Sequence, residues 1–388
     1  MFNPGELTGS GHFYAAKKRM TGTNIEVSMK RIRQLDAIRG LAVLVVFVHN
    51  TDIYPSLHLG LIKTNGWMGV DLFFVLSGFL ITGILLDTKR TDGYFKNFYA
   101  RRCLRIWPLY YSALLFMFVV LPHVRPSQAE MVFSARSSPW WAYPLFLQNF
   151  LVPIPTMATG LLGVTWSLAV EEQFYLVWPL IVRLCSESQL RKIALGVICL
   201  SPFLRFYLSL HKVVIYSNTF CRLDGLMAGA FLALIIRSSR FLPSKYLAGA
   251  WITVFVSATL ALGLDALHLR WIVFSFVSLA AVAFVYLALF SKQRFLQAVL
   301  TNRLLVYIGT ISYGIYVLEK IPLDVIKALH LEKYPLAAFL FTALATFTLA
   351  ALSWNFLEKP FLRLKRSFGR GAAIQRHTTD RVLETRET

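Results

Sequence analysis

Long apolar stretches, separated by shorter polar segments, fill most of this chain. Crossing the hydrocarbon core of a bilayer takes about 20 apolar residues in a helix. Ten stretches are close to that length, at 36–54, 67–87, 106–123, 161–184, 193–210, 220–237, 246–263, 271–290, 303–320 and 336–357. The pattern predicts an all-α protein, a polytopic membrane helix bundle of about ten transmembrane helices.

The remaining segments are expected to flank or cover one membrane domain at 29–361. Residues 1–28 are polar and lack the apolar core of a signal peptide, so they are either a disordered leader or an over-called translation start. Residues 362–388 are basic and predict a cytosolic tail. The stretch at 140–154 is too short and proline-broken to span, which favours a half-helix or an interfacial segment.

Composition supports the membrane assignment. Hydrophobic residues make up 56% of the 388 residues and charged residues only 15%, whereas a soluble domain carries about 25% charged residues. A net charge of +20 would suggest a nucleic-acid partner for a soluble protein, but enrichment of Lys and Arg in cytoplasmic loops explains it here. The four cysteines form no C-x-x-C pair, so we expect reduced packing residues and no metal site.

The distribution of Lys and Arg predicts sidedness. When the two ends and every second loop are grouped, they hold 29 of the 40 Lys and Arg residues, and the intervening loops hold 9. Cytoplasmic segments are the ones enriched in these residues. We therefore expect an even number of spans, with both termini in the cytosol.

Several ionisable residues fall inside the predicted spans, where a charge is costly and is a functional-site hypothesis by default. We expect two structural ion pairs among them, because an unpaired buried carboxylate would be neutralised instead. One joins Asp71 to a cation such as Arg39, and the other joins Arg222 to Asp224. The full set is Asp36, Arg39, His49, Asp71, Glu171, Glu172, Arg222, Asp224, Glu319 and Glu358.

The first span, LDAIRGLAVLVVFVHN, carries Arg39 and His49 about 15 Å apart along the helix axis. Histidine changes its protonation near neutral pH, which suits general acid–base catalysis. The alternative is an interfacial histidine that water satisfies, and the helix alone favours neither interpretation.

Two further phrases place charges at or inside spans. In FYARRCLRIWPLYY, Arg102 and Arg105 share one helix face, and paired arginines fit phosphate oxygens, although positive-inside anchoring explains this motif better when it is taken alone. In WSLAVEEQFYLVWPL, Glu171 and Glu172 point about 100° apart. At least one of them is expected to face the bundle interior, where it would orient a histidine or pair with an arginine.

Taken together, seven phrases resemble the acyltransferase-3 family of membrane acyltransferases, which acylate sugars, exopolysaccharides, O-antigens and some small molecules. The phrases are LDAIRGLAVLVVFVH, GVDLFFVLSGFLIT, FYARRCLRIWPLYY, WSLAVEEQFYLVWPL, RLDGLMAGAFLAL, GTISYGIYVLE and FLEKPF, in order from 35 to 361. The resemblance implies a ten-helix fold, a cytosolic acyl-CoA donor, and an acceptor hydroxyl within or beyond the membrane. It also implies that Arg39 and His49 form the family's first-helix motif and that Arg102 and Arg105 contact donor phosphates.

The chain departs from the family pattern at two positions. The family usually separates the first-helix arginine and histidine by eleven residues, which return to within about 20° of one face, but here ten residues place His49 about 80° away from Arg39. The late phrase ends in Glu319, where the family often has histidine. Both departures put a shared site for these residues in question.

These observations lead to one hypothesis and two alternatives. We expect an O-acyltransferase of a bacterial inner (plasma) membrane that moves an acyl group, acetyl by default, from acyl-CoA to a hydroxyl of a glycan or glycolipid, with His49 as general base and Glu171 or Glu172 fixing its tautomer. Acyl-CoA is a co-substrate, no cofactor is tightly bound, and the other partner is membrane lipid. The alternatives are a transporter or flippase of an envelope glycan precursor, and a non-catalytic membrane partner of glycan assembly.

Overall fold

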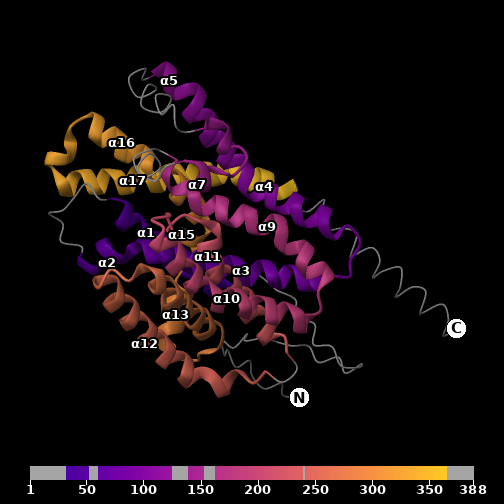
Figure 1. Ribbon diagram of the computed structural model, residues 1–388. Coiled ribbons are helices and arrows are strands. Elements are labelled where there is room, and N and C mark those ends of the chain that lie inside the picture. The colour runs from indigo at the N-terminus through magenta and orange to yellow at the C-terminus, as the bar shows by residue number, and fades with distance from the viewer. Residues whose placement is uncertain (1–31, 52–59, 125–138, 153–161, 239–240, 365–388) are drawn as a thin grey trace, which may run out of the picture.

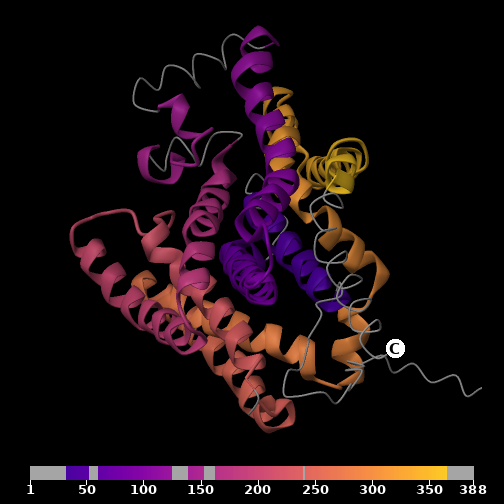
Figure 2. The same ribbon diagram turned by 90° about the vertical axis from the view of Figure 1, so that its right-hand side faces the viewer.

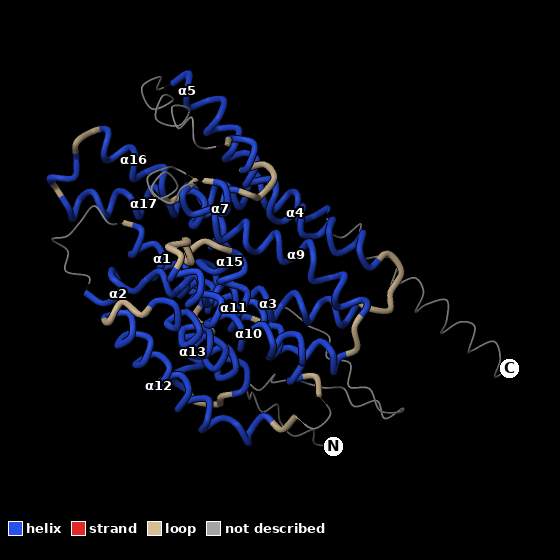
Figure 3. The backbone as a smooth tube through the Cα atoms, in the orientation of Figure 1, coloured by secondary structure: helices blue, strands red, loops and turns tan. Residues whose placement is uncertain are grey.

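The computed structural model describes residues 32–51, 60–124, 139–152, 162–238 and 241–364. These residues form helices and loops and no strand, as Figure 3 shows. The predicted leader at 1–28 lies outside the described residues, as does most of the predicted tail at 362–388. The prediction of an all-α protein is therefore confirmed for the described part of the chain.

Each of the ten predicted stretches overlaps one long helix. The long helices are α1 (Arg33–Asn50), α3 (Gly69–Thr88), α4 (Tyr94–Leu115), α9 (Trp166–Leu184), α10 (Glu187–Leu210), α11 (Thr219–Ile236), α12 (Leu247–Ala266), α13 (Arg270–Phe290), α15 (Arg303–Leu318) and α17 (Pro335–Ser353). Shorter helices are α2 (Gly60–Asn65), α5 (Leu121–Val124), α7 (Gln148–Leu151), α14 (Arg294–Leu300), α16 (Lys320–Ala328) and α18 (Lys359–Leu364). One-turn π-helices at Phe116–Val120 and Trp354–Glu358 extend α4 and α17.

Seven of the described helices are long and apolar enough to cross a membrane: α3, α4, α10, α11, α12, α13 and α17. The count is eight if α14 and α15, which meet at a 47° bend, form one span. Helices α1 and α9 each carry three charged residues, which lowers their apolar content. Helices α1, α9 and α15 nevertheless contribute residues to the candidate site described below.

The outer helices expose large apolar side chains. In α10, α12 and α17, about a fifth or less of the most apolar window is buried inside the protein, 17%, 17% and 22% respectively. Phe203, Phe255 and Leu344 are each at least 65% exposed. Soluble proteins rarely expose apolar surface on this scale, so lipid is the expected neighbour of these faces.

The segment at 140–154 does not form a span. Its described part holds a one-turn 3-10 helix at Trp140–Ala142 and the four-residue α7. Asn149 donates to the Thr219 hydroxyl at 2.8 Å, and Gln173 donates to Asn149 Oδ1 at 2.9 Å. These bonds tie the segment to α11 and α9, and its described part forms no helix long enough to span.

Four central helices approach one another through glycines. A Cβ atom on Gly309 of α15 would lie 1.7 Å from the Asp36 carbonyl oxygen of α1, and one on Gly69 of α3 would lie 2.8 Å from the Ala42 carbonyl oxygen of α1. A Cβ atom on Gly78 of α3 would lie 1.8 Å from the Leu226 carbonyl oxygen of α11. Small residues at membrane helix crossings permit such close approach. Figures 1 and 2 show α1 and α3, in indigo and violet, at the centre of the bundle.

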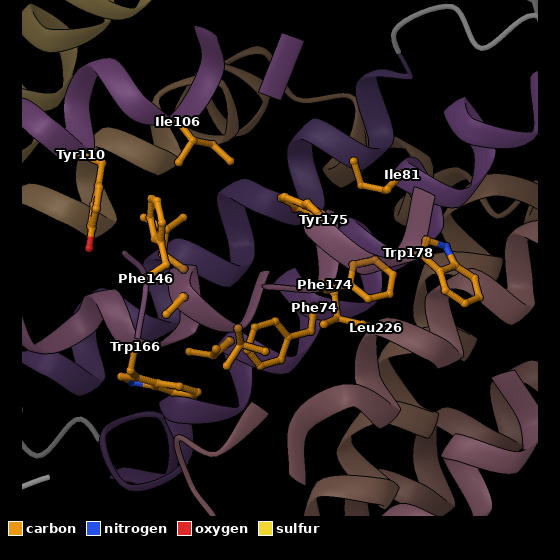
Figure 4. Close-up of a cluster of buried hydrophobic side chains, with 14 of the residues drawn as sticks. Phe74, Ile81, Ile106, Tyr110, Phe146, Trp166, Phe174, Tyr175, Trp178 and Leu226 are labelled. Carbon is orange, nitrogen blue, oxygen red and sulfur yellow. The ribbon is translucent and has the colours of Figure 1, made fainter. Parts of the chain in front are cut away.

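Aromatic side chains fill the space between α3 and α9. Figure 4 shows Phe74 and Trp166 side by side, with Phe174 and Trp178 further along the same cluster. The rings of Phe174 and Trp178 stack with centroids 5.5 Å apart, and Trp178 Nε1 donates to the Thr82 hydroxyl at 2.8 Å. The buried indole N–H thus has a partner, as such groups usually do.

The two predicted ion pairs are wrong in their partners. Asp71 pairs with Arg222 at 2.8 Å, and Asp224 pairs with Arg205 at 2.8 Å; all four side chains are at most 2% exposed. Residues two apart on a helix do not face each other, so Arg222 and Asp224 point to different neighbours. Helix α3 begins beside Ala42 and Val46 of α1. The turn of α3 that lies beside Arg39 therefore comes after the turn that carries Asp71. We call Asp71, Arg205, Arg222 and Asp224 the ion-pair cluster.

The ion-pair cluster is tightly enclosed. The guanidinium carbon of Arg222 lies 4.0 Å from the centroid of the Phe274 ring, with Phe74, Trp166 and Tyr216 within 5.7 Å. Arg205 also donates to the Cys221 carbonyl at 2.6 Å. Aromatic faces attract buried cations, so the cluster joins α3, α10, α11 and α13 as part of the packed interior.

Candidate active site

A cavity of about 100 Å³ lies on another side of α3, between α1, α3, α4, α9 and α15. On α3 its lining extends from Val70 to Ile81, about 16 Å at 1.5 Å per residue. A small volume over that length means a narrow cavity. Its polar lining residues are Arg39, Ser77, Arg102, Arg105, Ser167, Glu171, Tyr175, Ser312, Tyr313 and Tyr316. We call this space the arginine cavity.

Three arginines from two helices meet at the arginine cavity. Arg39 is 3.6 Å from Asp36 on its own helix. Arg102 lies over the rings of Phe98 and Tyr175, at 5.9 and 5.6 Å. Neither Arg102 nor Arg105 has a salt bridge within 4 Å to another described residue. The prediction that these two arginines share a face agrees with their common place in the lining.

The two adjacent glutamates face different surroundings. Glu171 lines the cavity, where it accepts hydrogen bonds from Ser77 Oγ at 2.6 Å and from the Tyr175 hydroxyl at 3.2 Å. Glu172 lies outside the lining, and Trp107 Nε1 donates to it at 3.5 Å. The expected angle of about 100° between successive helical residues explains the difference. Glu171 is thus the glutamate that faces the interior.

His49 lies apart from the lining residues. Its Nδ1 is 2.7 Å from the Lys63 carbonyl oxygen of α2. Since a carbonyl can only accept, Nδ1 carries the proton of this bond, and in a neutral ring Nε2 then keeps its lone pair. The group that fixes the tautomer is therefore a backbone carbonyl, and the hydrogen-bond partners of Glu171 and Glu172 lie elsewhere.

Helix α1 is regular over Arg33–Asn50, so it does not correct the ten-residue spacing. The residue eleven positions after Arg39 is Asn50, which donates to a carboxylate oxygen of Glu319. Arg39 and Asn50 thus share one face within about 20°, and His49 points away from it.

Hydroxyl groups of the cavity were missing from the sequence-based site. Ser167 and Tyr316 have their hydroxyl oxygens 2.8 Å apart, and Tyr313 donates to the Ile106 carbonyl at 2.8 Å. The signal was available as spacing, because Ser167, Glu171 and Tyr175 recur every four residues on α9 and therefore line one face. It was obscured because serine and tyrosine are common packing residues in such helices.

Comparison with known proteins identifies the family. The sequence profile described as "Acyltransferase domain" of the acyltransferase-3 family matches residues 32–355. Peptidoglycan O-acetyltransferase OatA of Listeria monocytogenes is 29% identical over 86% of this chain and 56% of its own length. Putative peptidoglycan O-acetyltransferase YrhL of Bacillus subtilis is 30% identical over 88% of this chain and 57% of its own length.

The matched region is only part of those relatives. The chain spans less than three fifths of the length of the curated relatives it matches, including a putative O-acetyltransferase of Staphylococcus aureus at 26% identity. No solved structure matches the chain. The profile nevertheless covers α1 to α17, with the whole arginine cavity. The chain is therefore a multi-pass membrane protein that belongs to the acyltransferase-3 family, whose members transfer acyl groups other than aminoacyl groups.

Proposed function

We propose that this protein is an O-acetyltransferase that moves an acetyl group from cytosolic acetyl-CoA to a hydroxyl of an envelope glycan. The family and the names of its peptidoglycan-modifying relatives support this substrate class. The arginine cavity is the observation that carries the proposal. With the sidedness expected from Lys and Arg, the protein crosses the inner membrane ten times and keeps both termini in the cytosol.

The donor binds through its phosphates. Arg39, Arg102 and Arg105 bring three guanidinium groups to a cavity with one carboxylate, that of Glu171. Guanidinium groups bind phosphate oxygens in a bidentate manner, and such charge-assisted bonds are stronger than neutral ones. The narrow cavity then admits the thin pantetheine arm, so that the thioester lies between the helices.

The transfer itself needs one base. His49 Nε2 takes the proton from the acceptor hydroxyl, whose oxygen attacks the thioester carbonyl, and CoA leaves as a thiolate that is then protonated. A positioned base is worth about 10²- to 10⁴-fold in rate, and holding the two reactants together adds more. The Lys63 carbonyl supports this role, because its bond to Nδ1 directs the free lone pair to Nε2.

The test uses the purified protein in proteoliposomes with labelled acetyl-CoA and peptidoglycan glycan strands. We expect CoA release in proportion to a new ester, detected by mass spectrometry. His49→Ala should abolish transfer, whereas His123→Ala should not, although His123 makes the same 2.7 Å contact with a backbone carbonyl. Transfer retained by His49→Ala would exclude His49 as the base. Glycan movement across the membrane without CoA release would favour a flippase instead.

A further inference from the structure

A second buried acid lies beyond one end of the arginine cavity. Glu319 follows the last residue of α15 and is 0% exposed. One carboxylate oxygen accepts a hydrogen bond from Asn50 Nδ2. The other, Oε2, is buried and has no hydrogen-bond partner among the described residues. Buried polar atoms almost always have partners, because an unsatisfied one is costly, so this oxygen calls for a partner that the described residues do not supply.

Two helix faces lead from the cavity to this acid. On α15, Ser312 and Tyr316 line the cavity, and Glu319 follows Tyr316 by three residues on the same side, about 4.5 Å further along the axis. On α1, Arg39 lines the cavity, and Asn50 continues its face eleven residues later. The Asn50–Glu319 pair therefore lies where both faces end.

The polar neighbours of the pair bond other groups than the free oxygen. Lys320 donates to the Asn50 carbonyl at 3.4 Å. His49, on the adjacent side of α1, is held by Lys63. Tyr316 directs its hydroxyl to the Val164 carbonyl at 2.8 Å. Each of these polar groups is engaged with a backbone carbonyl, and none of them bonds Oε2.

We propose that Glu319 and Asn50 form the subsite that binds and orients the acceptor sugar; this inference rests on the proposed function. Asn50 holds one carboxyl oxygen of Glu319 in place, and a second hydroxyl of the sugar, next to the one that His49 deprotonates, donates a hydrogen bond to Oε2. The bond places the acceptor sugar at the opposite end of the cavity from the arginine side that binds the donor phosphates. The ligand class is an alcohol hydroxyl of a glycan, bound separately from acyl-CoA.

The test measures the half-saturating concentrations of the acceptor and of the donor separately. Glu319→Gln is isosteric and keeps an oxygen that can accept from Asn50, but its amide nitrogen cannot accept the hydroxyl proton. In proteoliposomes with acetyl-CoA and peptidoglycan glycan strands, we expect the half-saturating acceptor concentration to rise about 2- to 10-fold, the usual value of one hydrogen bond. The half-saturating acetyl-CoA concentration and acceptor-independent hydrolysis should not change.

Two controls separate this role from a structural one. Asp265→Asn alters another mostly buried acid, bonded to Arg270 at 3.2 Å, and should leave all three quantities unchanged. Glu319→Asp restores a carboxylate and should recover part of the acceptor affinity. Equal acceptor affinity in Glu319→Gln and wild type overturns the subsite alone. A wild-type protein that forms no ester overturns the proposed function and the subsite together.

Discussion

Helix α3 has a different group of buried charges on each of two sides. In the ion-pair cluster, Asp71 and Asp224 each have an arginine at 2.8 Å, and aromatic rings enclose Arg222. In the arginine cavity, Arg102 and Arg105 lack a salt bridge to any described residue, and space remains beside them. Each arginine of the ion-pair cluster thus has a carboxylate in contact, although Nε and Nη1 of Arg222 have no hydrogen-bond partner among the described residues, whereas Arg102 and Arg105 have no carboxylate in contact.

The difference separates structural charge from functional charge. Burying an ion pair costs desolvation free energy, which the attraction between the two charges offsets only when they are close and well oriented. The pairs of the ion-pair cluster meet that condition. A group of arginines without that compensation is stable only if an anion or water supplies it. The identity of a charged residue in a span therefore does not define its role, and the position of its counter-charge does.

The largest expected effect comes from breaking the ion-pair cluster. Asp71→Ala leaves Arg222 buried without its carboxylate, which should cost about 3–5 kcal/mol of unfolding free energy. The measurement is chemical unfolding of the protein in detergent micelles. An unchanged midpoint would mean that the aromatic box alone holds Arg222, and the contrast with the cavity would weaken.

The next effect comes from the arginine cavity and should spare stability. Arg102→Ala combined with Arg105→Ala should raise the half-saturating acetyl-CoA concentration about 100-fold or more, because each charge-assisted bond contributes about 1.5–3 kcal/mol. The half-saturating acetyl-CoA concentration of the Arg102→Lys, Arg105→Lys variant should lie between those of wild type and the double alanine variant, since lysine keeps the charge and loses the bidentate geometry. A destabilised double alanine variant with unchanged donor affinity would place these arginines with the structural charges.

A smaller effect tests the sign of the cavity charge. Glu171→Gln keeps an acceptor for Ser77 and removes the carboxylate. The Glu171 carboxylate and the bound donor phosphates carry charge of the same sign. As an order of magnitude, two unit charges about 15 Å apart at an effective dielectric constant of about 20 repel by about 1 kcal/mol. We therefore expect the half-saturating acetyl-CoA concentration to fall several-fold. A rise would indicate that Glu171 positions the donor instead of repelling it.

The smallest effect belongs to a charge pair outside both groups. Asp265 lies 3.2 Å from Arg270, whose side chain is 58% exposed. Because Arg270 is mostly exposed, water still solvates its charge after Asp265→Asn, so the unfolding midpoint should shift only slightly. A loss as large as that of Asp71→Ala would remove the distinction between pairs with a buried arginine and pairs with an exposed one.

Much of the helix order could be predicted from the sequence, because the apolar stretches are long and polar segments separate them. The partners of the buried ion pairs could not be predicted. Arg222 and Asp224 are close in sequence, yet successive residues rotate by about 100°, so each meets a different helix. The same rotation separates Glu171 from Glu172 and His49 from the face of Arg39. Only the packing of neighbouring helices decides which of those directions leads to a cavity.

The glycine contacts have a mechanical consequence. Helices α15, α1, α3 and α11 touch backbone to backbone at Gly309, Gly69 and Gly78, and such contacts cannot loosen by rotamer changes. Helices α4 and α9, which carry Arg102, Arg105 and Glu171, contain no glycine. One wall of the cavity is thus a fixed block and the opposite wall is held by side chains. Under the proposed function, α4 and α9 are therefore the helices expected to move when acetyl-CoA enters and CoA leaves, while α1, α3, α11 and α15 keep their places.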